Sequence, residues 1–241
     1  MNAIPRLLIH GASGRMGLAL LRLAAARDDL NVVAAVSRKS PAQRVVDGVP
    51  QFAASELSGV PEFDVAIDFS LPEGFDPVLA LCAQRGRALV SGTTGLSSEQ
   101  NRAIEAASQR IAVVWAANYS LGVAVLAELV RRAAAALPAW DCDIVEAHHT
   151  RKLDAPSGTA LHLGQAVAIG SGRDPHYASL RAGDIVGEHT VQFASAGERL
   201  QLIHRATNRD IFARGALEAA LKVVRQAPGR YGLAELMFPN L

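Results

Sequence analysis

The first half of the chain alternates short hydrophobic runs with longer alanine- and leucine-rich stretches. The short runs cover residues 6–10, 31–36, 65–70, 88–92 and 111–115. They are almost continuously apolar, which is typical of parallel strands covered by helices on both faces. The stretch 15–26 between the first two runs has the length and spacing of an amphipathic helix. This alternation predicts an α/β fold with a doubly wound, Rossmann-like parallel sheet over residues 1–118.

The pattern changes after residue 118. A long helical stretch ends near Pro138, and a candidate strand, DIVEAHH, follows it. Beyond a polar loop, we expect a helix that begins at Ser157 and two alternating strands near EHTVQFAS and ERLQLIHRA. This order predicts an α+β domain over residues 119–209 with an open, mixed and mostly antiparallel sheet. A closing helix within about 210–241 is expected to pack back on the first domain.

Composition narrows the range of partners. Half of the 241 residues are apolar, so the chain can bury a substantial core. Twenty-four basic and twenty-three acidic residues give a net charge of +1 without long runs of either sign, so neither nucleic acid nor a membrane is an expected partner. Cys82 and Cys142 form no CxxC pair, and the N-terminus predicts neither a signal peptide nor a membrane span. We expect reduced thiols and a cytoplasmic location.

A glycine-rich loop joins the first predicted strand to the first predicted helix. Gly11, Gly14 and Gly17 have the spacing GxxGxxG, one residue longer than the common GxGxxG. Gly11 would permit a tight turn, and Gly14 would let backbone N–H groups approach a pyrophosphate at the positive end of the helix dipole. Arg15 and Met16 would border the same anion. We expect a dinucleotide here; the alternative is a turn that only packs a helix on a strand.

The end of the second predicted strand, about 20 residues beyond such a loop, usually decides which dinucleotide binds. An acid there would bond the 2′-hydroxyl of NAD, but this chain has Ser37, Arg38 and Lys39. Two cations and a small hydroxyl can pair with a 2′-phosphate. We therefore predict that NADPH is used at least as well as NADH; the alternative is that both cations are solvated surface residues.

The stretch 146–160 gathers the residues best suited to acid–base chemistry. It reads EAHHTRKLDAPSGTA and contains His148, His149 and Lys152 ahead of Ser157, a predicted helix N-cap. The helix start would offer N–H groups to a carboxylate, and the loop can move a proton. Adjacent histidines on a strand point to opposite faces, so at most one of them must face a substrate. No cysteine or further histidine lies at ligand spacing, so no metal site is expected.

The same stretch resembles the signature segment of the bacterial 4-hydroxy-tetrahydrodipicolinate reductase family, long called the dihydrodipicolinate reductases. The resemblance extends in the family's order over nearly the whole chain. The matching segments are GASGRMG at 11–17, IDFSLPEG at 67–74, SGTTGL at 91–96, AANYSLGV at 116–123, RAGDIVGEH at 181–189 and HRATNRDIFARGALEAA at 204–220.

The resemblance implies an enzyme of lysine biosynthesis through diaminopimelate. NADPH or NADH would deliver hydride to the conjugated imine that forms when 4-hydroxy-tetrahydrodipicolinate, a cyclic dicarboxylate, loses water. His148 would be the catalytic acid or base and Lys152 the proton donor. The substrate-binding residues would be His149, Ser157, Gly158, Thr159 and Thr94. The cofactor-binding residues would be Gly11, Ala12, Ser13, Gly14, Arg15, Met16, Arg38, Gly92, Thr93, Thr94, Ala116, Ala117, Asn118 and Tyr119. The resemblance also implies a homotetramer built through the open sheet.

Two features depart from the family pattern. Ser37 stands where the family commonly has an acid, which bears on the choice between NADPH and NADH. The region between Leu163 and Arg181 is shorter, which bears on substrate-domain and subunit contacts.

Two alternative functions are a dinucleotide-sensing binding protein and a reductase of another small imine or aldehyde. The intact HHTRK run argues against the sensor, and only the family resemblance argues against the other reductase.

Overall fold

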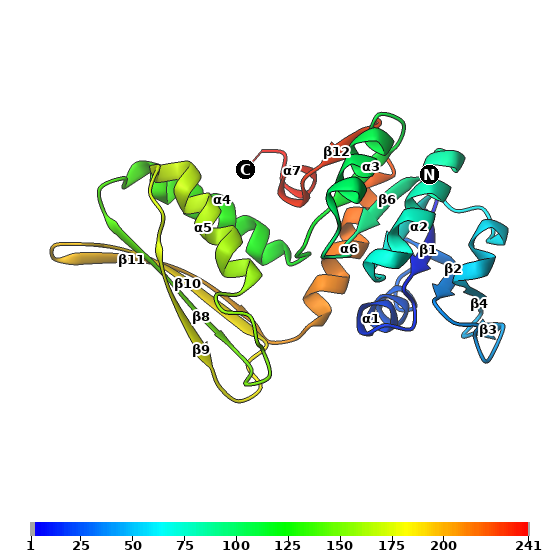
Figure 1. Ribbon diagram of the computed structural model, residues 1–241, viewed down its shortest axis with the longest axis horizontal. Coiled ribbons are helices and arrows are strands. Elements are labelled where there is room, and N and C mark those ends of the chain that lie inside the picture. The colour runs from blue at the N-terminus through cyan, green and yellow to red at the C-terminus, as the bar shows by residue number, and fades with distance from the viewer. Residues whose placement is uncertain (1–2, 241) are drawn as a thin grey trace. The chain divides into compact units, whose positions relative to one another are not determined.

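The computed structural model describes residues 3–240. It contains two compact units (Figure 1). The larger unit comprises residues 3–119 and 212–240, and the smaller unit comprises residues 120–211. The long helix α6 (Asp210–Val223) starts at the end of the smaller unit and belongs mostly to the larger one.

The larger unit contains an eight-stranded sheet with the order β12-β7-β6-β5-β1-β2-β4-β3. Its strands pair in parallel except β3, which is antiparallel to β4. The doubly wound parallel sheet predicted from the apolar runs is confirmed. The elements, besides α6, are β1 (Arg6–His10), α1 (Arg15–Ala24), β2 (Asn31–Ser37), β3 (Val45–Val46), β4 (Val49–Ala53), the 3-10 helix η1 (Ala54–Gly59), β5 (Val65–Asp68), α2 (Pro72–Arg85), β6 (Ala88–Ser91), α3 (Ser98–Ser108), β7 (Ala112–Trp115), β12 (Gly229–Tyr231) and α7 (Leu233–Met237).

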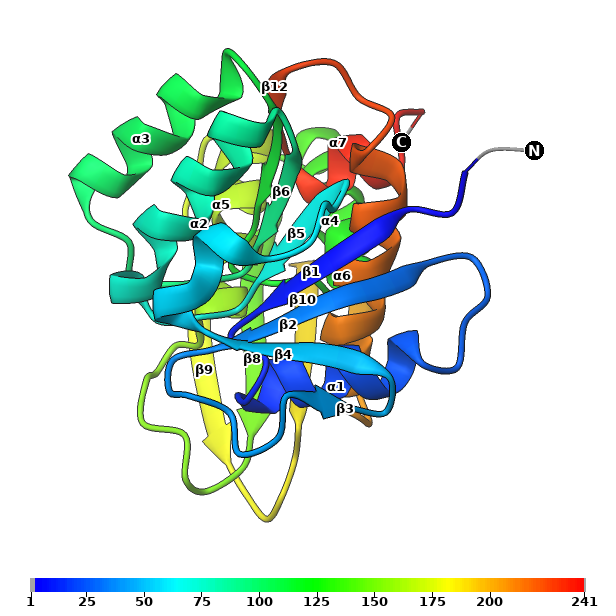
Figure 2. The same ribbon diagram turned by 90° about the vertical axis from the view of Figure 1, so that its right-hand side faces the viewer.

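Helices cover both faces of this sheet, with α2 and α3 on one face and α1 and α6 on the other (Figure 2). Leu8, Phe75 and Ile104 are fully buried in the core cluster between the sheet, α2 and α3. The neighbours of Leu8 in β1, Leu7 and Ile9, are also fully buried because they point to the opposite face. Double coverage therefore explains why the strands read as continuous apolar runs.

The smaller unit packs two helices on one face of a four-stranded sheet with the order β11-β10-β8-β9. β10 is antiparallel to β8 and β11, whereas β8 and β9 are parallel, so the open mixed sheet is confirmed. The core between sheet and helices includes the fully buried Ile144, Leu163 and Val191. The elements are α4 (Leu121–Ala136), β8 (Asp141–His148), α5 (Gly158–Ser171), β9 (His176–Arg181), β10 (Gly187–Ser195) and β11 (Glu198–Ala206).

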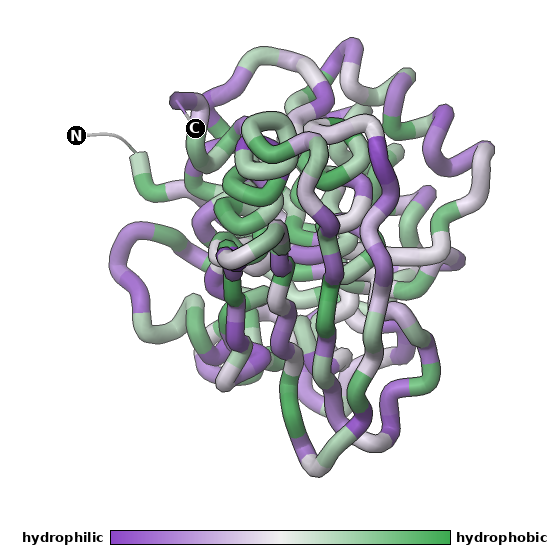
Figure 3. The backbone as a smooth tube through the Cα atoms, turned by 90° about the vertical axis from the view of Figure 1, so that its left-hand side faces the viewer, coloured by the Kyte–Doolittle hydropathy of each residue, from purple (hydrophilic) through white to green (hydrophobic). Residues whose placement is uncertain are grey.

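The other face of the smaller sheet carries exposed apolar side chains. Val145, Ile203 and Leu180 are 36%, 43% and 56% exposed. The register places Val145 and Ile203 on either side of Thr190, and Leu180 beside Ala147, so all three side chains share the face opposite Ile144. Hydrophobic and hydrophilic segments alternate along these strands in Figure 3. Among the described helices, none is long and apolar enough to cross a lipid bilayer.

Candidate functional site

The glycine loop between β1 and α1 has a backbone that only small residues can adopt. Gly11 has a φ of +80°, and a Cβ there would lie 2.5 Å from the carbonyl oxygen of Phe69. Gly14 donates its N–H to the carbonyl of Gly11 at 3.0 Å and is the N-cap of α1. Arg15 and Met16 therefore lie in the first turn of α1, where backbone N–H groups lack intrahelical acceptors. The loop geometry fits a phosphate group.

A cavity of about 920 Å³ begins at this loop. Ala12 and Ser13 line one side, and Ser37, Arg38 and Lys39 at the end of β2 line another. The hairpin of β3 and β4 also contributes to the walls. Within residues 3–240, no carboxylate forms an ion pair with Arg38 or Lys39. The structure thus brings the glycine loop and the two predicted phosphate-binding cations to one cavity.

A buried polar network lies at the carboxyl ends of β1, β5 and β6. His10 and Ser91 are the register neighbours of Asp68, which is fully buried. The two oxygens of Asp68 lie 2.8 Å from Nδ1 of His10 and from the hydroxyls of Ser91 and Thr93. Burial alone would raise the pKa of Asp68, but hydrogen bonds with His10, Ser70 and Thr93 outweigh it and lower the pKa. One ionised carboxylate therefore ties the loop after β6 to its neighbouring strands.

The predicted cofactor residues after β6 and β7 lie at this same edge of the sheet, because both strands end there in parallel. The N–H of Ala116 donates to the carbonyl of Ser91 at 3.2 Å. Thr93 is buried, whereas its neighbour Thr94 is exposed. Tyr119 is buried as well, and its hydroxyl donates to the carbonyl of Ser91 at 2.8 Å. The side chain of Tyr119 thus stabilises the end of β6. Because this side chain is buried, a ligand would contact Tyr119 through its backbone.

Glu146 occupies the centre of the polar cluster in the smaller unit. It is fully buried on β8, and its carboxylate accepts two hydrogen bonds from Arg181 on β9, at 2.7 and 3.0 Å. The N–H of Ser157 donates to the same carboxylate at 3.3 Å, and Nδ1 of His148 lies 2.5 Å from it. Burial alone would raise the pKa of Glu146, but hydrogen bonds from Arg181, Ser179 and His148 prevail and lower it to about 2.

His148, the predicted acid or base, is the last residue of β8 and is 8% exposed. Burial lowers its pKa, and the charges of Lys152 and Arg181 add to this effect, while Glu146 opposes it. Because Nδ1 faces Glu146, the remaining ring nitrogen, Nε2, is the one that can exchange a proton with a ligand. The structure therefore places a neutral imidazole beside an ionised carboxylate.

His149 follows the strand and has different partners. Its Nε2 lies 3.0 Å from Nη2 of Arg209. Burial and the charges of Arg151 and Arg209 lower the pKa of His149. Nδ1 of His149 is buried and has no hydrogen-bond partner among the described residues. This nitrogen is a polar atom that a bound ligand can satisfy.

Lys152, the predicted proton donor, lies in the loop after β8. Its Nζ donates to both carboxylate oxygens of Asp154 at 2.8 Å. Its side chain is 21% exposed. The hydrogen bond from Lys152 lowers the pKa of Asp154. Asp154 thus holds the ammonium group on this loop. Arg181 contacts the same loop, because its Nη2 donates to the backbone carbonyl of Asp154 at 2.7 Å.

The start of α5 offers backbone N–H groups that lack intrahelical acceptors. Ser157 is the N-cap, as predicted, and its hydroxyl accepts the N–H of Ala160 at 3.2 Å. Gly158 and Thr159 form the first turn. The hydroxyl of Ser157 also lies 3.1 Å from Nε2 of His189. His189 is buried, and its burial together with the nearby His148 lowers its pKa to about 4. His189 packs edge-on against the ring of His148 at 5.2 Å.

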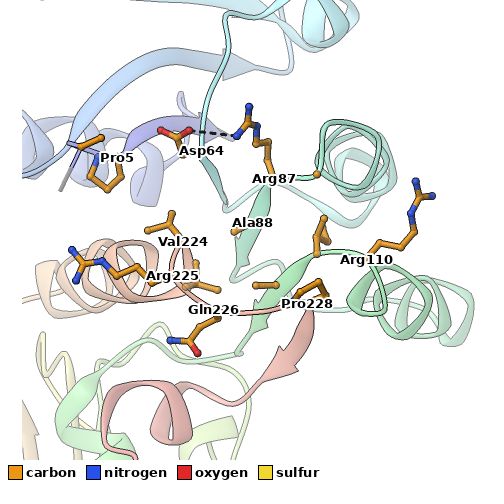
Figure 4. A pocket seen from close by; sticks show the side chains of 14 residues that line it. Pro5, Asp64, Arg87, Ala88, Arg110, Val224, Arg225, Gln226 and Pro228 are labelled. Atoms are coloured by element: carbon orange, nitrogen blue, oxygen red, sulfur yellow. Dashed lines mark ion pairs between the residues drawn. The ribbon is translucent and has the colours of Figure 1, made fainter.

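A second cavity, of about 470 Å³, opens at the opposite, amino-terminal edge of the larger sheet (Figure 4). Three arginines line it, but Arg87 lies 3.6 Å from Asp64. Arg110 and Arg225 extend in opposite directions away from the cavity in Figure 4. These cations do not converge on one ligand, and none of the predicted site residues lines this cavity.

The sequence analysis did not single out several residues of the polar cluster in the smaller unit. Glu146 could have been predicted, because residues two apart on a strand share a face and Glu146 precedes His148 by two. Arg181, His189 and Arg209 come from segments far along the chain, so only the folded topology brings them to β8. Among residues 3–240, no group of three or more histidine, cysteine, aspartate or glutamate side chains could hold a metal ion.

Comparisons with known proteins agree over nearly the whole chain. Residues 5–119 match the family described as dihydrodipicolinate reductase, N-terminus, and residues 122–237 match dihydrodipicolinate reductase, C-terminus. A 4-hydroxy-tetrahydrodipicolinate reductase from Stenotrophomonas maltophilia (strain K279a) is 70% identical over 98% of this chain and 100% of its own length. A relative of the same name from Xylella fastidiosa (strain M23) is 60% identical over 98% of this chain and 100% of its own length.

The fold agrees with a solved structure described as a dipicolinate-bound dihydrodipicolinate reductase from Paenisporosarcina sp. TG-14. The TM-score is 0.82 at 24% identity, over 95% of this chain and 98% of that chain. The two matching domains and the highly identical relatives establish that this chain belongs to the dihydrodipicolinate reductase family and is an NAD(P)H-dependent oxidoreductase.

Proposed function

We propose that this chain reduces 4-hydroxy-tetrahydrodipicolinate to tetrahydrodipicolinate in lysine biosynthesis through diaminopimelate. Relatives that are 60% and 70% identical are named for this reaction. The structural observation that supports it best is the arrangement of Arg181, Glu146 and His148. It supplies a buried imidazole for proton exchange, and Glu146 also contacts the helix start at Ser157, where a carboxylate can bind.

The reaction consumes one hydride and one proton and releases one water molecule. A bound nicotinamide dinucleotide supplies the hydride. We assign the proton exchange to Nε2 of His148 and the role of proton donor to Lys152, which Asp154 holds on the same loop. Burial and the nearby cations lower the pKa of His148, so its ring is neutral at neutral pH and can accept or return a proton.

We assign substrate binding mainly to the smaller unit. The first turn of α5, with Ser157, Gly158 and Thr159, suits one carboxylate of the substrate, because helix starts offer N–H groups and a positive dipole end. His149 would contact the other side of the ring through its unpartnered Nδ1. Thr94, an exposed residue of the larger unit, stays a predicted substrate-binding residue.

We assign cofactor binding to the larger unit. The cavity of about 920 Å³ has a glycine loop at one side and Ser37, Arg38 and Lys39 at another, which suits the pyrophosphate and a 2′-phosphate. The buried Asp68 holds the loop of Gly92 and Thr93 at the carboxyl edge of the sheet, where α/β folds bind their ligands. These contacts support NADPH as a substrate at least as good as NADH.

We also propose that the chain assembles as a homotetramer through the open face of the smaller sheet. Val145, Ile203 and Leu180 place apolar surface on that face, opposite the helices. Burying such side chains of an uncovered sheet face against another copy would stabilise the assembly.

We also propose a cytoplasmic location, where the free thiols of Cys82 and Cys142 stay reduced.

Replacing His148 tests the proposed reaction. With the cyclised product of pyruvate and aspartate semialdehyde as substrate, the wild type should consume NADPH, followed by absorbance. His148→Gln should lower kcat by roughly 10²–10⁴, the usual contribution of a positioned acid or base, with unchanged NADPH affinity. His176→Gln is the control, because the His176 side chain is 90% exposed on β9. A wild type that consumes no NADPH would refute the function, and an unaltered kcat in His148→Gln would remove His148 from the mechanism.

Replacing Arg38 tests the choice of cofactor. Arg38→Ala should lower kcat/KM for NADPH by about 10–100-fold and leave the value for NADH nearly unchanged, because only NADPH has the 2′-phosphate that a charged hydrogen bond would stabilise. Arg102→Ala is the control, because Arg102 pairs with Glu99 on α3 and lies outside the cavity. Equal losses with both cofactors, or a strong preference of the wild type for NADH, would contradict this assignment.

Charges on the open sheet face test the assembly. The double variant Val145→Glu and Ile203→Glu should convert a tetramer into smaller species in size-exclusion chromatography with light scattering, because two buried carboxylates per chain would be unpaired. Ile169→Glu is the control, because Ile169 is 73% exposed on α5, on the helical side of the sheet. The proposal fails if the double variant remains a tetramer.

A further inference from the structure

The carboxylate of Glu146 is saturated by donors. Oε1 accepts from Nη2 of Arg181 at 2.7 Å and from the N–H of Ser157 at 3.3 Å. Oε2 accepts from Nη1 of Arg181 at 3.0 Å and faces Nδ1 of His148 at 2.5 Å. An ionised carboxylate only accepts hydrogen bonds, so Nδ1 of His148 must carry the proton of this bond. The neutral ring is therefore protonated at Nδ1 and unprotonated at Nε2.

Gly187 on β10 lies next to Nε2 of His148. A Cβ at Gly187 would lie 3.0 Å from Nε2 of His148, so any larger residue on this part of β10 would crowd that nitrogen. Nδ1 is enclosed by Glu146, whereas Nε2 lies beside a residue without a side chain. The ring orientation that Glu146 selects thus turns Nε2 away from the carboxylate, toward the position where Gly187 has no side chain.

Titratable and charged groups face His148 from each neighbouring segment. Glu146 lies on the same strand, Arg181 on β9, His189 on β10 and Lys152 in the following loop. Of these groups, only Glu146 raises the pKa of His148, while the two cations lower it. Removing the negative charge of Glu146 must therefore lower the pKa of His148 further.

We propose that Glu146, clamped by Arg181, is a positioning residue that fixes the tautomer and orientation of His148, so that Nε2 exchanges the proton with the substrate. This inference rests on the proposed function of His148. Arg181 holds the carboxylate in place, because its planar guanidinium donates to both oxygens of Glu146 and prevents the carboxylate from turning away from His148.

The test is the pH dependence of kcat/KM in Glu146→Gln. The limb of the wild-type profile that is lost in His148→Gln reports His148. In Glu146→Gln that limb should move to lower pH by about half a unit or more, because the pKa of His148 falls. kcat should fall by about 10–100-fold, as for other partners that orient a histidine. KM for the dicarboxylate and the Kd of NADPH should change by less than about 3-fold.

Glu188→Gln is the matched control, because Glu188 is partly exposed on the adjacent β10 and pairs with Arg205. It should keep the wild-type kcat and pH profile. A folded Glu146→Gln enzyme with wild-type kcat and an unmoved limb would overturn the inference. Loss of turnover in His148→Gln with normal turnover in Glu146→Gln would overturn this inference alone, whereas normal turnover in His148→Gln would overturn the proposed role of His148 itself.

Arg181→Lys provides a second measurement if Glu146→Gln does not fold. Lysine keeps the positive charge beside Glu146 but cannot form the bidentate clamp. We expect kcat to fall by about 3–10-fold, less than in Glu146→Gln, because the charge beside Glu146 remains and only the bidentate geometry is lost, with KM unchanged. A wild-type kcat in a folded Arg181→Lys enzyme would contradict the clamp.

Discussion

The geometry of the smaller unit depends on the ion pair between the fully buried Glu146 and the partly exposed Arg181. A carboxylate without solvent exposure is costly unless it is paired and fully hydrogen-bonded, so Glu146 depends on the hydrogen bonds from Arg181. Arg181 also donates to the carbonyl of Asp154, so the pair joins β8 and β9 to the loop that carries Lys152. Orientation of His148, placement of the loop and the start of α5 at Ser157 thus share one anchor.

The larger unit uses the same principle with different partners. Asp68 is as fully buried as Glu146, but a histidine and the hydroxyls of Ser91 and Thr93 hold it instead of an arginine. In both units, an ionised carboxylate near the end of a strand gathers donors from neighbouring segments. The loops that carry the proposed chemistry are therefore fixed by hydrogen bonds to buried charge rather than by hydrophobic packing, which has no direction.

The sequence predicted the larger features because they have periodic signals. Apolar runs identified the parallel strands, and Ser157 and Gly158 marked the start of α5. The hairpin of β3 and β4 was missed, although Asp47 and Gly48 form its turn with positive φ, because β3 has only two residues, both exposed, and β4 is only partly buried. β9 was missed because it has no buried side chain and hence no apolar pattern. The ion pair between Glu146 and Arg181 could not be predicted from the sequence, because these residues are far apart along the chain and only the parallel pairing of β8 and β9 brings them together.

The central claim is that Glu146 holds His148 with its proton on Nδ1. The most direct test is the tautomer of His148, measured by the ¹⁵N chemical shifts of its ring in labelled enzyme at neutral pH, with the spectrum of His148→Gln for assignment. The account predicts a neutral ring with a protonated Nδ1 and an unprotonated Nε2. A neutral ring that carries its proton on Nε2 would contradict it, because Glu146 would then have no hydrogen bond to accept from His148.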